Sequence, residues 1–252
     1  MSPPTDQSLA KVPEVTIVFW ITKILATTVG ETAGDALSMS MNLGYLVGTT
    51  IFALIFIIAV GVQIAAKKFH PVVYWTTIIA TTTLGTTLAD FADRSLGIGY
   101  AGGTAILLAL LLISLFTWYR TLGSVALGSV SSPKAEAFYW ATIMFSQTLG
   151  TALGDWSADT AGLGYKGGAL LFSAVLALIA IAHYRTRISR TFLFWAAFIV
   201  TRPLGAVVGD FLDKPRSAGG LAMSRYSASA VLLMLIAASI VFWSQKAAQR
   251  SH

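Results

Sequence analysis

The sequence predicts an all-α integral membrane protein whose eight transmembrane helices form four tandem, parallel two-helix repeats. Hydrophobic residues make up 56% of the 252 residues and charged residues only 11%, whereas soluble domains carry about 25% charged residues. Four apolar runs approach the roughly 20 residues that cross a bilayer, and they lie at 45–66, 99–119, 167–184 and 227–243. One residue pattern also recurs four times along the chain.

The recurring pattern begins with Phe or Tyr followed by Trp, at Trp20, Trp75, Trp140 and Trp195. A Gly follows ten residues after each Trp, and an Asp follows five residues later. These residues are Gly30, Gly85, Gly150 and Gly205, and Asp35, Asp90, Asp155 and Asp210. A Tyr comes ten residues after the Asp in the first three copies, and the fourth copy has a six-residue insertion before its Tyr. Four matches at one spacing indicate an internally repeated unit.

Each repeat is predicted to contain an odd helix with a polar stripe, a Gly-rich turn and an apolar even helix. The repeats cover 14–66, 71–120, 136–185 and 191–244, between an N-terminal tail (1–13) and a C-terminal tail (245–252). The spans are expected near 15–36, 43–66, 71–92, 98–119, 136–157, 164–184, 191–212 and 226–244. Because every repeat has two spans, all four repeats point the same way through the membrane.

Basic residues predict the orientation of the bundle. Ten Lys and Arg residues lie on the side that carries both tails, against five on the side of the Gly-rich turns. The positive-inside rule therefore places both termini in the cytoplasm, and the Trp residues in the cytoplasmic headgroup region. We expect a multi-pass protein of the bacterial inner membrane that contacts the lipid bilayer and binds no nucleic acid, despite its net charge of +6.

The repeated aspartates are the main candidate site. A charged side chain at the centre of a bilayer costs about 2.5–3.5 kcal/mol, so Asp35, Asp90, Asp155 and Asp210 need partners. Residues four apart lie on one helix face. By this spacing Lys23 and Glu31 share a face with Asp35, Gln147 shares one with Asp155, and Arg202 shares one with Asp210. We expect the four aspartates and Glu31 to bind a substrate or ion, with the aspartates as metal ligands. Lys23, Arg202 and Gln147 are the expected counter-ion and coupling residues. Alternatively, basic residues of the outer turns neutralise the acids in a structural network.

The four copies of F/Y-W-x9-G-x4-D-x9-Y, each with two predicted spans, resemble the bacterial membrane proteins of the domain of unknown function 347 repeat family. The resemblance covers the chain from Phe19 to Trp243 and implies an eight-span membrane protein, with no activity established for the family. The fourth copy departs through its inserted Lys214-Pro215-Arg216 turn, and only the first copy contains Glu31. The repeats are therefore not interchangeable.

The favoured function is a transporter or channel for a hard cation, either a divalent metal ion or a proton-coupled ion. Carboxylate and hydroxyl oxygens in a chain without cysteine form a hard ligand set. One alternative is a proton-coupled transporter of an organic anion or small metabolite, held by Arg202 and Lys23. Another is a membrane scaffold or assembly factor without transport activity. No nucleophile with a base and an orienting group is visible, so we expect neither an enzyme nor a bound cofactor.

Overall fold

The computed structural model describes residues 10–248, and these form eight long helices joined by short segments. Residues 1–9 and 249–252 of the predicted cytoplasmic tails lie outside the described residues. The helices are α1 (Ile17–Asp35), α2 (Gly44–Ala65), α3 (Pro71–Asp90), α4 (Gly99–Leu122), α5 (Pro133–Asp155), α6 (Gly164–Arg185), α7 (Arg190–Asp213) and α8 (Arg225–Phe242). The predicted all-helical fold is confirmed for the described part of the chain, and the predicted spans differ from these helices by only a few residues at most ends.

Local sequence signals explain where the inner helices begin and end. The hydroxyl groups of Thr16, Ser132 and Ser189 cap α1, α5 and α7 by accepting a hydrogen bond from a backbone N–H of the first turn. In the first three repeats the α-helix ends at the repeat Asp, and a five-residue π-helical turn follows. The fourth repeat lacks this turn because α7 continues to Asp213, after which the inserted segment leads to α8.

Four odd-numbered helices form a closed inner ring, in the order α1, α3, α5, α7 and back to α1. The repeat glycines allow this close packing. A Cβ atom built on Gly85 would lie 2.9 Å from backbone and side-chain atoms of Gln147 on the next helix. Gly30, Gly150 and Gly205 make the equivalent approaches to Thr82, Arg202 and Thr27. Small residues let helix backbones approach closely in a membrane protein, so each repeat glycine marks a crossing point between neighbouring inner helices.

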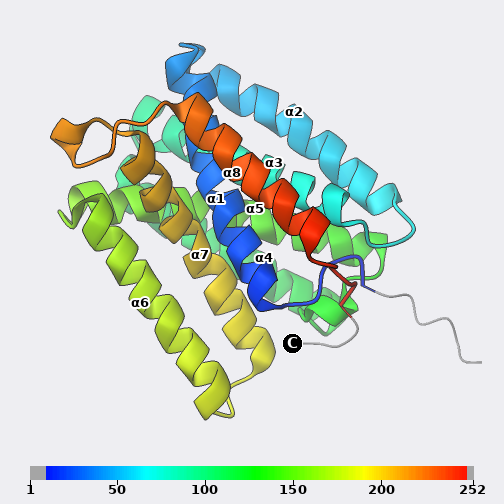
Figure 1. Cartoon of the computed structure of the whole chain (residues 1–252). Helices are drawn as coiled ribbons and strands as arrows, with labels where there is room; N and C mark the ends of the chain where they lie inside the picture. The colour runs from blue at the N-terminus through cyan, green and yellow to red at the C-terminus, as the bar shows by residue number, and fades with distance from the viewer. Residues whose placement is uncertain (1–9, 249–252) are drawn as a thin grey trace, which may run out of the picture.

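Each even-numbered helix packs on the odd helix of the following repeat, and not mainly on the odd helix of its own repeat. Thus α2 packs on α3, α4 on α5, and α6 on α7, while α8 packs on α1 and closes the ring (Figure 1). Hydroxyl pairs support this closure, because Thr22 lies 3.0 Å from Ser239 and Thr32 lies 2.7 Å from Ser229. The sequence repeat is therefore not the packing unit, and neighbouring repeats interlock around the whole bundle.

The outer helices carry the apolar surface of the molecule. Among the described residues, five helices are long and apolar enough to cross a membrane, namely α2, α4, α6, α7 and α8. Large aliphatic side chains on the outer helices are widely exposed, including Ile58 at 66% and Leu170 at 73%. Helices α1, α3 and α5 are less apolar because of their many threonines, whose hydroxyls mostly donate to carbonyls one turn earlier in the same helix, as Thr83 does to Ile79. The chain is thus a membrane-like helical protein with a polar interior.

The repeated aromatic–Trp dipeptide lies inside the bundle, which corrects the prediction that the Trp side chains sit among lipid headgroups. Trp75, Trp140 and Trp195 are at most 4% exposed, and only Trp20 is partly exposed. Each Phe or Tyr contacts the Trp of the next repeat. The centroid distances are 5.6 Å for Phe19–Trp75, 5.7 Å for Tyr74–Trp140, 6.3 Å for Tyr139–Trp195 and 5.8 Å for Phe194–Trp20. The dipeptide therefore fastens neighbouring repeats together at this end of the bundle, here called the aromatic end.

Candidate ion site in the bundle interior

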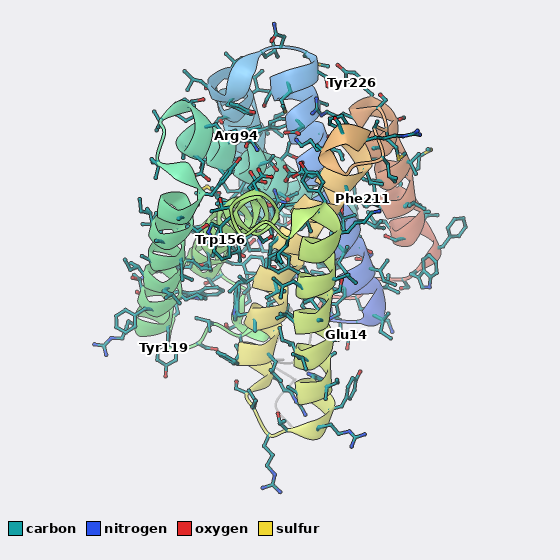
Figure 2. All side chains as sticks on the ribbon, turned by 90° about the vertical axis from the view of Figure 1, so that its left-hand side faces the viewer. Glu14, Arg94, Tyr119, Trp156, Phe211 and Tyr226 are labelled. Carbon is teal, nitrogen blue, oxygen red and sulfur yellow. The ribbon has the colours of Figure 1, made fainter. Side chains whose placement is uncertain are left out.

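The inner helices carry one buried side chain per turn at the same positions in all four repeats. These positions form four levels along the ring, each with one residue from every repeat. Counted from the aromatic end, the first level holds Lys23, Ile78, Ile143 and Phe198, and the second holds Thr27, Thr82, Gln147 and Arg202. The third level holds Glu31, Thr86, Thr151 and Ala206, and the fourth holds Asp35, Asp90, Asp155 and Asp210. None of these side chains exposes more than 4% of its surface. We call the second level the middle polar layer and the fourth the acidic layer. Figure 2 shows Arg94, which contacts the acidic layer, at the opposite end of the molecule from Tyr119.

Two basic side chains from the outer turns bridge the acidic layer in pairs. Lys214 Nζ lies 2.5 Å from Asp35 Oδ2 and 3.0 Å from Asp210 Oδ1. Arg94 lies 2.7 Å from Asp90 through Nε and 3.2 Å from Asp155 through Nη2. Every aspartate of the acidic layer therefore has a cationic partner, as the structural alternative proposed. The four-residue spacings of Asp90 to Arg94 and Asp210 to Lys214 are the sequence signal for these contacts.

Both bridging cations stay protonated in this setting. Burial lowers the pKa of the Lys214 ammonium, but Asp210 and Asp35 outweigh this effect and hold the pKa above its usual range. Burial likewise disfavours the charged Arg94 guanidinium, and Asp90 and Asp155 outweigh it, so that pKa is also raised. The two side chains therefore act as fixed positive charges and not as proton donors at neutral pH.

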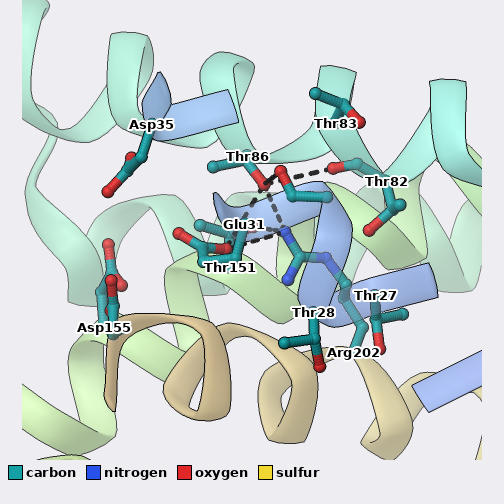
Figure 3. Close-up of polar contacts among 12 residues, drawn as sticks. Thr27, Thr28, Glu31, Asp35, Thr82, Thr83, Thr86, Thr151, Asp155 and Arg202 are labelled. Carbon is teal, nitrogen blue, oxygen red and sulfur yellow. Dashed lines mark hydrogen bonds and ion pairs between the residues drawn. The ribbon is translucent and has the colours of Figure 1, made fainter. Parts of the chain in front are cut away.

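A third cation reaches the acids from inside the bundle. Arg202 is fully buried, and its Nη2 atom lies 3.1 Å from Glu31 Oε2 and 2.6 Å from the Thr86 hydroxyl. The same atom also donates to the Thr151 hydroxyl. Figure 3 shows Arg202 extending from α7 toward Glu31, with Asp35 and Asp155 beyond it and Thr27 and Thr82 on the other side. Glu31 and Arg202, both predicted site residues, thus form a buried ion pair between the middle polar layer and the acidic layer.

Three carboxylates converge closely enough to share one ion. Oxygen atoms of Glu31, Asp35 and Asp210 all lie within 4.8 Å of one another. Some point between them is then within about 2.8 Å of all three, close to the 2.3–2.6 Å of Ca²⁺–oxygen bonds. Asp90 and Asp155 are at the same level but belong to the Arg94 pair. The structure therefore groups two of the four predicted metal ligands with Glu31, and holds the other two apart around Arg94.

Negative charge is in excess around this site. Arg225 joins the cluster through Asp213, at 2.9 Å, and Asp35, at 3.6 Å. Six carboxylates therefore contact four cationic side chains, and the fully ionised cluster carries a net charge of −2, from 4 minus 6. Excess buried charge of this kind requires a bound cation or protons on some of the carboxyl groups.

Lys23 and Gln147 lie deeper in the bundle than the acids. The ammonium group of Lys23 lies 3.4 Å from the Thr201 hydroxyl and 4.0 Å from the centre of the Phe198 ring. Within residues 10–248, no carboxylate oxygen lies within 4.0 Å of it. Gln147 is fully buried in the middle polar layer. The structure therefore brings neither residue into contact with the acidic layer.

A buried ion pair at the aromatic end was not anticipated from the sequence. Lys11 Nζ lies 2.6 Å from Glu136 Oε1, and it also donates to the carbonyls of Ile64 and Ala66 at the end of α2. The N-terminal segment is held there by backbone hydrogen bonds to residues 246 and 248 near the C-terminus. The one sequence signal for this pair is Glu136, four residues before Trp140, because the other three repeats have no acid at that position.

Comparison with known proteins identifies the repeated unit. The family model described as a Repeat of Unknown Function (DUF347) matches residues 18–69, 73–124, 138–189 and 193–248. Neither the curated proteins nor the solved structures give a match. The four matches begin just before each aromatic–Trp pair and together cover most of the chain, so the resemblance drawn from the motif is confirmed. The chain belongs to the DUF347 repeat family and contains four tandem copies of that repeat.

Proposed function

We propose that this protein is a secondary transporter for a hard cation, built from eight spans in the bacterial inner membrane with both termini in the cytoplasm. The basic residues at the aromatic end support that orientation through the positive-inside rule. The buried acidic cluster then faces the outer half of the membrane. Its net negative charge and its oxygen-only ligands favour a proton, an alkali ion or a divalent ion such as Mg²⁺, Mn²⁺ or Ca²⁺. No catalytic step is part of the proposal.

The observation that carries the proposal is the position of Lys214 among three carboxylates. Its ammonium group lies between Asp35 and Asp210, and Glu31 adjoins both acids. Lys214 comes from an outer turn, directly after α7, and is not part of the inner ring. In the proposal this side chain is a tethered cation that a transported ion replaces, so that binding of the ion and release of the outer turn are coupled.

Closure at both ends supports a transporter over an open channel. The acidic end is covered by ion pairs from Arg94, Lys214 and Arg225. The aromatic end is closed by the ring of aromatic–Trp contacts and by a 2.7 Å hydrogen bond between the hydroxyls of Tyr74 and Tyr139. A carrier that exposes a central site alternately to each side needs such a closed state. Opening the outer end requires the ion pairs to exchange partners.

Cation flux into proteoliposomes tests the proposal. The purified full chain would be assayed with H⁺, Na⁺, Mg²⁺, Mn²⁺ and Ca²⁺, beside Asp35→Asn and Asp210→Asn variants. We expect flux of at least one cation above protein-free liposomes, and a loss of tenfold or more in both variants. Asp159→Asn is the matched control, because Asp159 is an exposed acid of an outer turn. No flux of any cation, or flux unaffected by both variants, would leave the ion-paired cluster with the structural role of a membrane scaffold.

A further inference from the structure

The middle polar layer contains buried polar atoms that the ion site does not use. Arg202 donates only through Nη2, and its Nε and Nη1 atoms have no hydrogen-bond partner among the described residues. Both amide atoms of Gln147 and the hydroxyl of Thr82 are also without partners there. All three side chains are 0% exposed. Leaving such a group unpaired costs about 1–3 kcal/mol, so this layer is incomplete without a further polar species.

Donors dominate this part of the bundle. The unpaired atoms of Arg202 carry three N–H bonds, and Gln147 and Thr82 add amide and hydroxyl donors. Lys23, one turn closer to the aromatic end, contributes an ammonium group that contacts the Thr201 hydroxyl at 3.4 Å and the Phe198 ring. Glu31, in the next level toward the acidic layer, is already paired with Arg202 Nη2. A species that accepts hydrogen bonds and carries negative charge satisfies these donors.

We propose that Arg202, Lys23, Gln147 and Thr82 form a binding site for a small monovalent anion, a halide or a carboxylate. This site is separate from the cation site, which lies on the other side of the Glu31–Arg202 pair. Thr201, which accepts the Lys23 contact, also lines a pocket of about 730 Å³ between α1, α6 and α7. That pocket also has Arg190 and Thr16 at the aromatic end of the bundle, and Thr201 in its wall is the residue that contacts Lys23.

The site has a consequence for the proposed transport cycle. Arg202 contacts Glu31 through one nitrogen atom and faces the anion site with the others. An anion bound at Nε and Nη1 neutralises part of the guanidinium charge that Glu31 faces through Nη2, so its binding favours a cation or a proton at Glu31. The anion is then a co-substrate or an obligatory partner of the cation. This consequence rests on the proposed transport function, whereas anion binding itself does not.

Thermal unfolding of the purified full chain tests the site. Melting temperature would be measured at constant ionic strength while sodium gluconate is replaced by sodium chloride or by sodium acetate. We expect a saturable rise of about 2–4 °C with one of the two anions, the size of shift that about 1 kcal/mol of ligand stabilisation gives in a domain of this length. The two arms separate a halide from a carboxylate site. Absence of a rise with either anion, or an equal non-saturating rise with both, would overturn the proposal.

Substitutions at Gln147 make the test specific. Gln147→Leu removes the amide donors, and we expect the anion-dependent rise to be lost. Gln147→Glu places a negative charge in the same layer as Arg202, and we expect a melting temperature near the anion-saturated value that no longer responds to either anion. Arg216→Gln, which removes an exposed cation of an outer turn, should keep the full anion response. If both Gln147 variants respond to anions like the native chain, the layer is not an anion site.

The cation and anion proposals can fail separately. Asp35→Asn and Asp210→Asn should abolish cation flux while the anion-dependent rise in melting temperature remains. Cation flux without any anion response refutes only the anion site. An anion response in a protein without cation flux refutes only the cation transport.

Discussion

Individual residues have different environments although they occupy equivalent repeat positions. The four aspartates of the acidic layer lie at one level, yet Asp35 and Asp210 share Lys214 whereas Asp90 and Asp155 share Arg94. The difference arises four residues after the Asp, where the second and fourth copies have the cations Arg94 and Lys214 and the first and third copies have Met39 and Asp159.

Lys214→Gln is expected to make the protein's stability depend on added cations. Without the ammonium group, Asp210 loses its cationic partner and Asp35 keeps only the longer contact with Arg225, so a divalent ion takes the place of the ammonium group between them. The melting temperature should therefore fall in chelator and rise again with Mg²⁺, Mn²⁺ or Ca²⁺, by more than in the native chain. Arg216→Gln, which changes an exposed cation of the same turn, is the control. A variant that responds to cations no more than this control would contradict Lys214 as an ion surrogate.

The buried carboxyl group of Asp93 is expected to make the stability of the folded protein depend on pH. Its carboxylate is buried in the second outer turn against Gly103 and has no hydrogen-bond partner among the described residues. Burial raises its pKa to about 6, and nearby Arg94 offsets only part of this effect. The folded state therefore binds the proton more tightly than the unfolded chain, and stability is lost as the pH rises from about 4 through 6.

Asp93→Asn should remove this loss. The melting temperature of the variant should equal that of the native chain near pH 4, exceed it increasingly through pH 6, and keep a constant advantage above about pH 7. Asp159→Asn, at an exposed acid of the third outer turn, is the control variant for the loss of one outer-turn carboxyl. A pH-independent difference for Asp93→Asn would show that the Asp93 carboxyl is not responsible.

At the scale of elements, hydropathy and spacing predict the helices but not their partners. The apolar even helices and the Thr-rich odd helices follow from the repeat pattern, and residues 10–248 contain the eight long helices. The pattern does not show which odd helix each even helix packs on, and in the structure α2 packs on α3 and α8 on α1. The headgroup prediction for Trp20 and its equivalents fails because spacing and depth along the helix do not show that a Phe or Tyr of the preceding repeat contacts each Trp.

Two Gly→Ala variants distinguish the effect of close packing in the inner ring from the effect of helix propensity. Gly85→Ala forces α3 away from α5, because the new methyl group would lie 2.9 Å from backbone atoms of Gln147 and Thr148. We expect a loss of about 1–3 kcal/mol, as for other overpacked interiors, seen as a lower melting temperature. Gly61→Ala is the matched control, since a Cβ atom on Gly61 in α2 meets nothing within 4 Å. Equal stability of the two variants would argue against a close α3–α5 crossing.

The whole molecule is a ring whose first and last repeats meet without a covalent link. Helix α8 lies beside α1 (Figure 1), and Pro13 forms a backbone bridge with Ala247. Because every other interface of the ring joins consecutive repeats, this seam is the one that two chains would exchange in a swapped dimer. Its contacts also bring repeat 1, with Glu31 and Asp35, beside repeat 4, with Asp210 and Lys214. The cation site therefore depends on the closure of the ring within one chain.

Cysteine cross-linking tests that closure, because the native chain contains no cysteine. The hydroxyls of Thr22 and Ser239 are 3.0 Å apart, so Thr22→Cys with Ser239→Cys should form a disulfide under mild oxidation. With a protease site inserted in the loop at 186–189, the cleaved protein should migrate as one species without reductant and as two fragments with it. Thr22→Cys with Leu235→Cys, on an exposed face of α8, should give two fragments in both cases. Covalent dimers in place of linked fragments would show that the seam joins two chains, and the cation site would then require both of them.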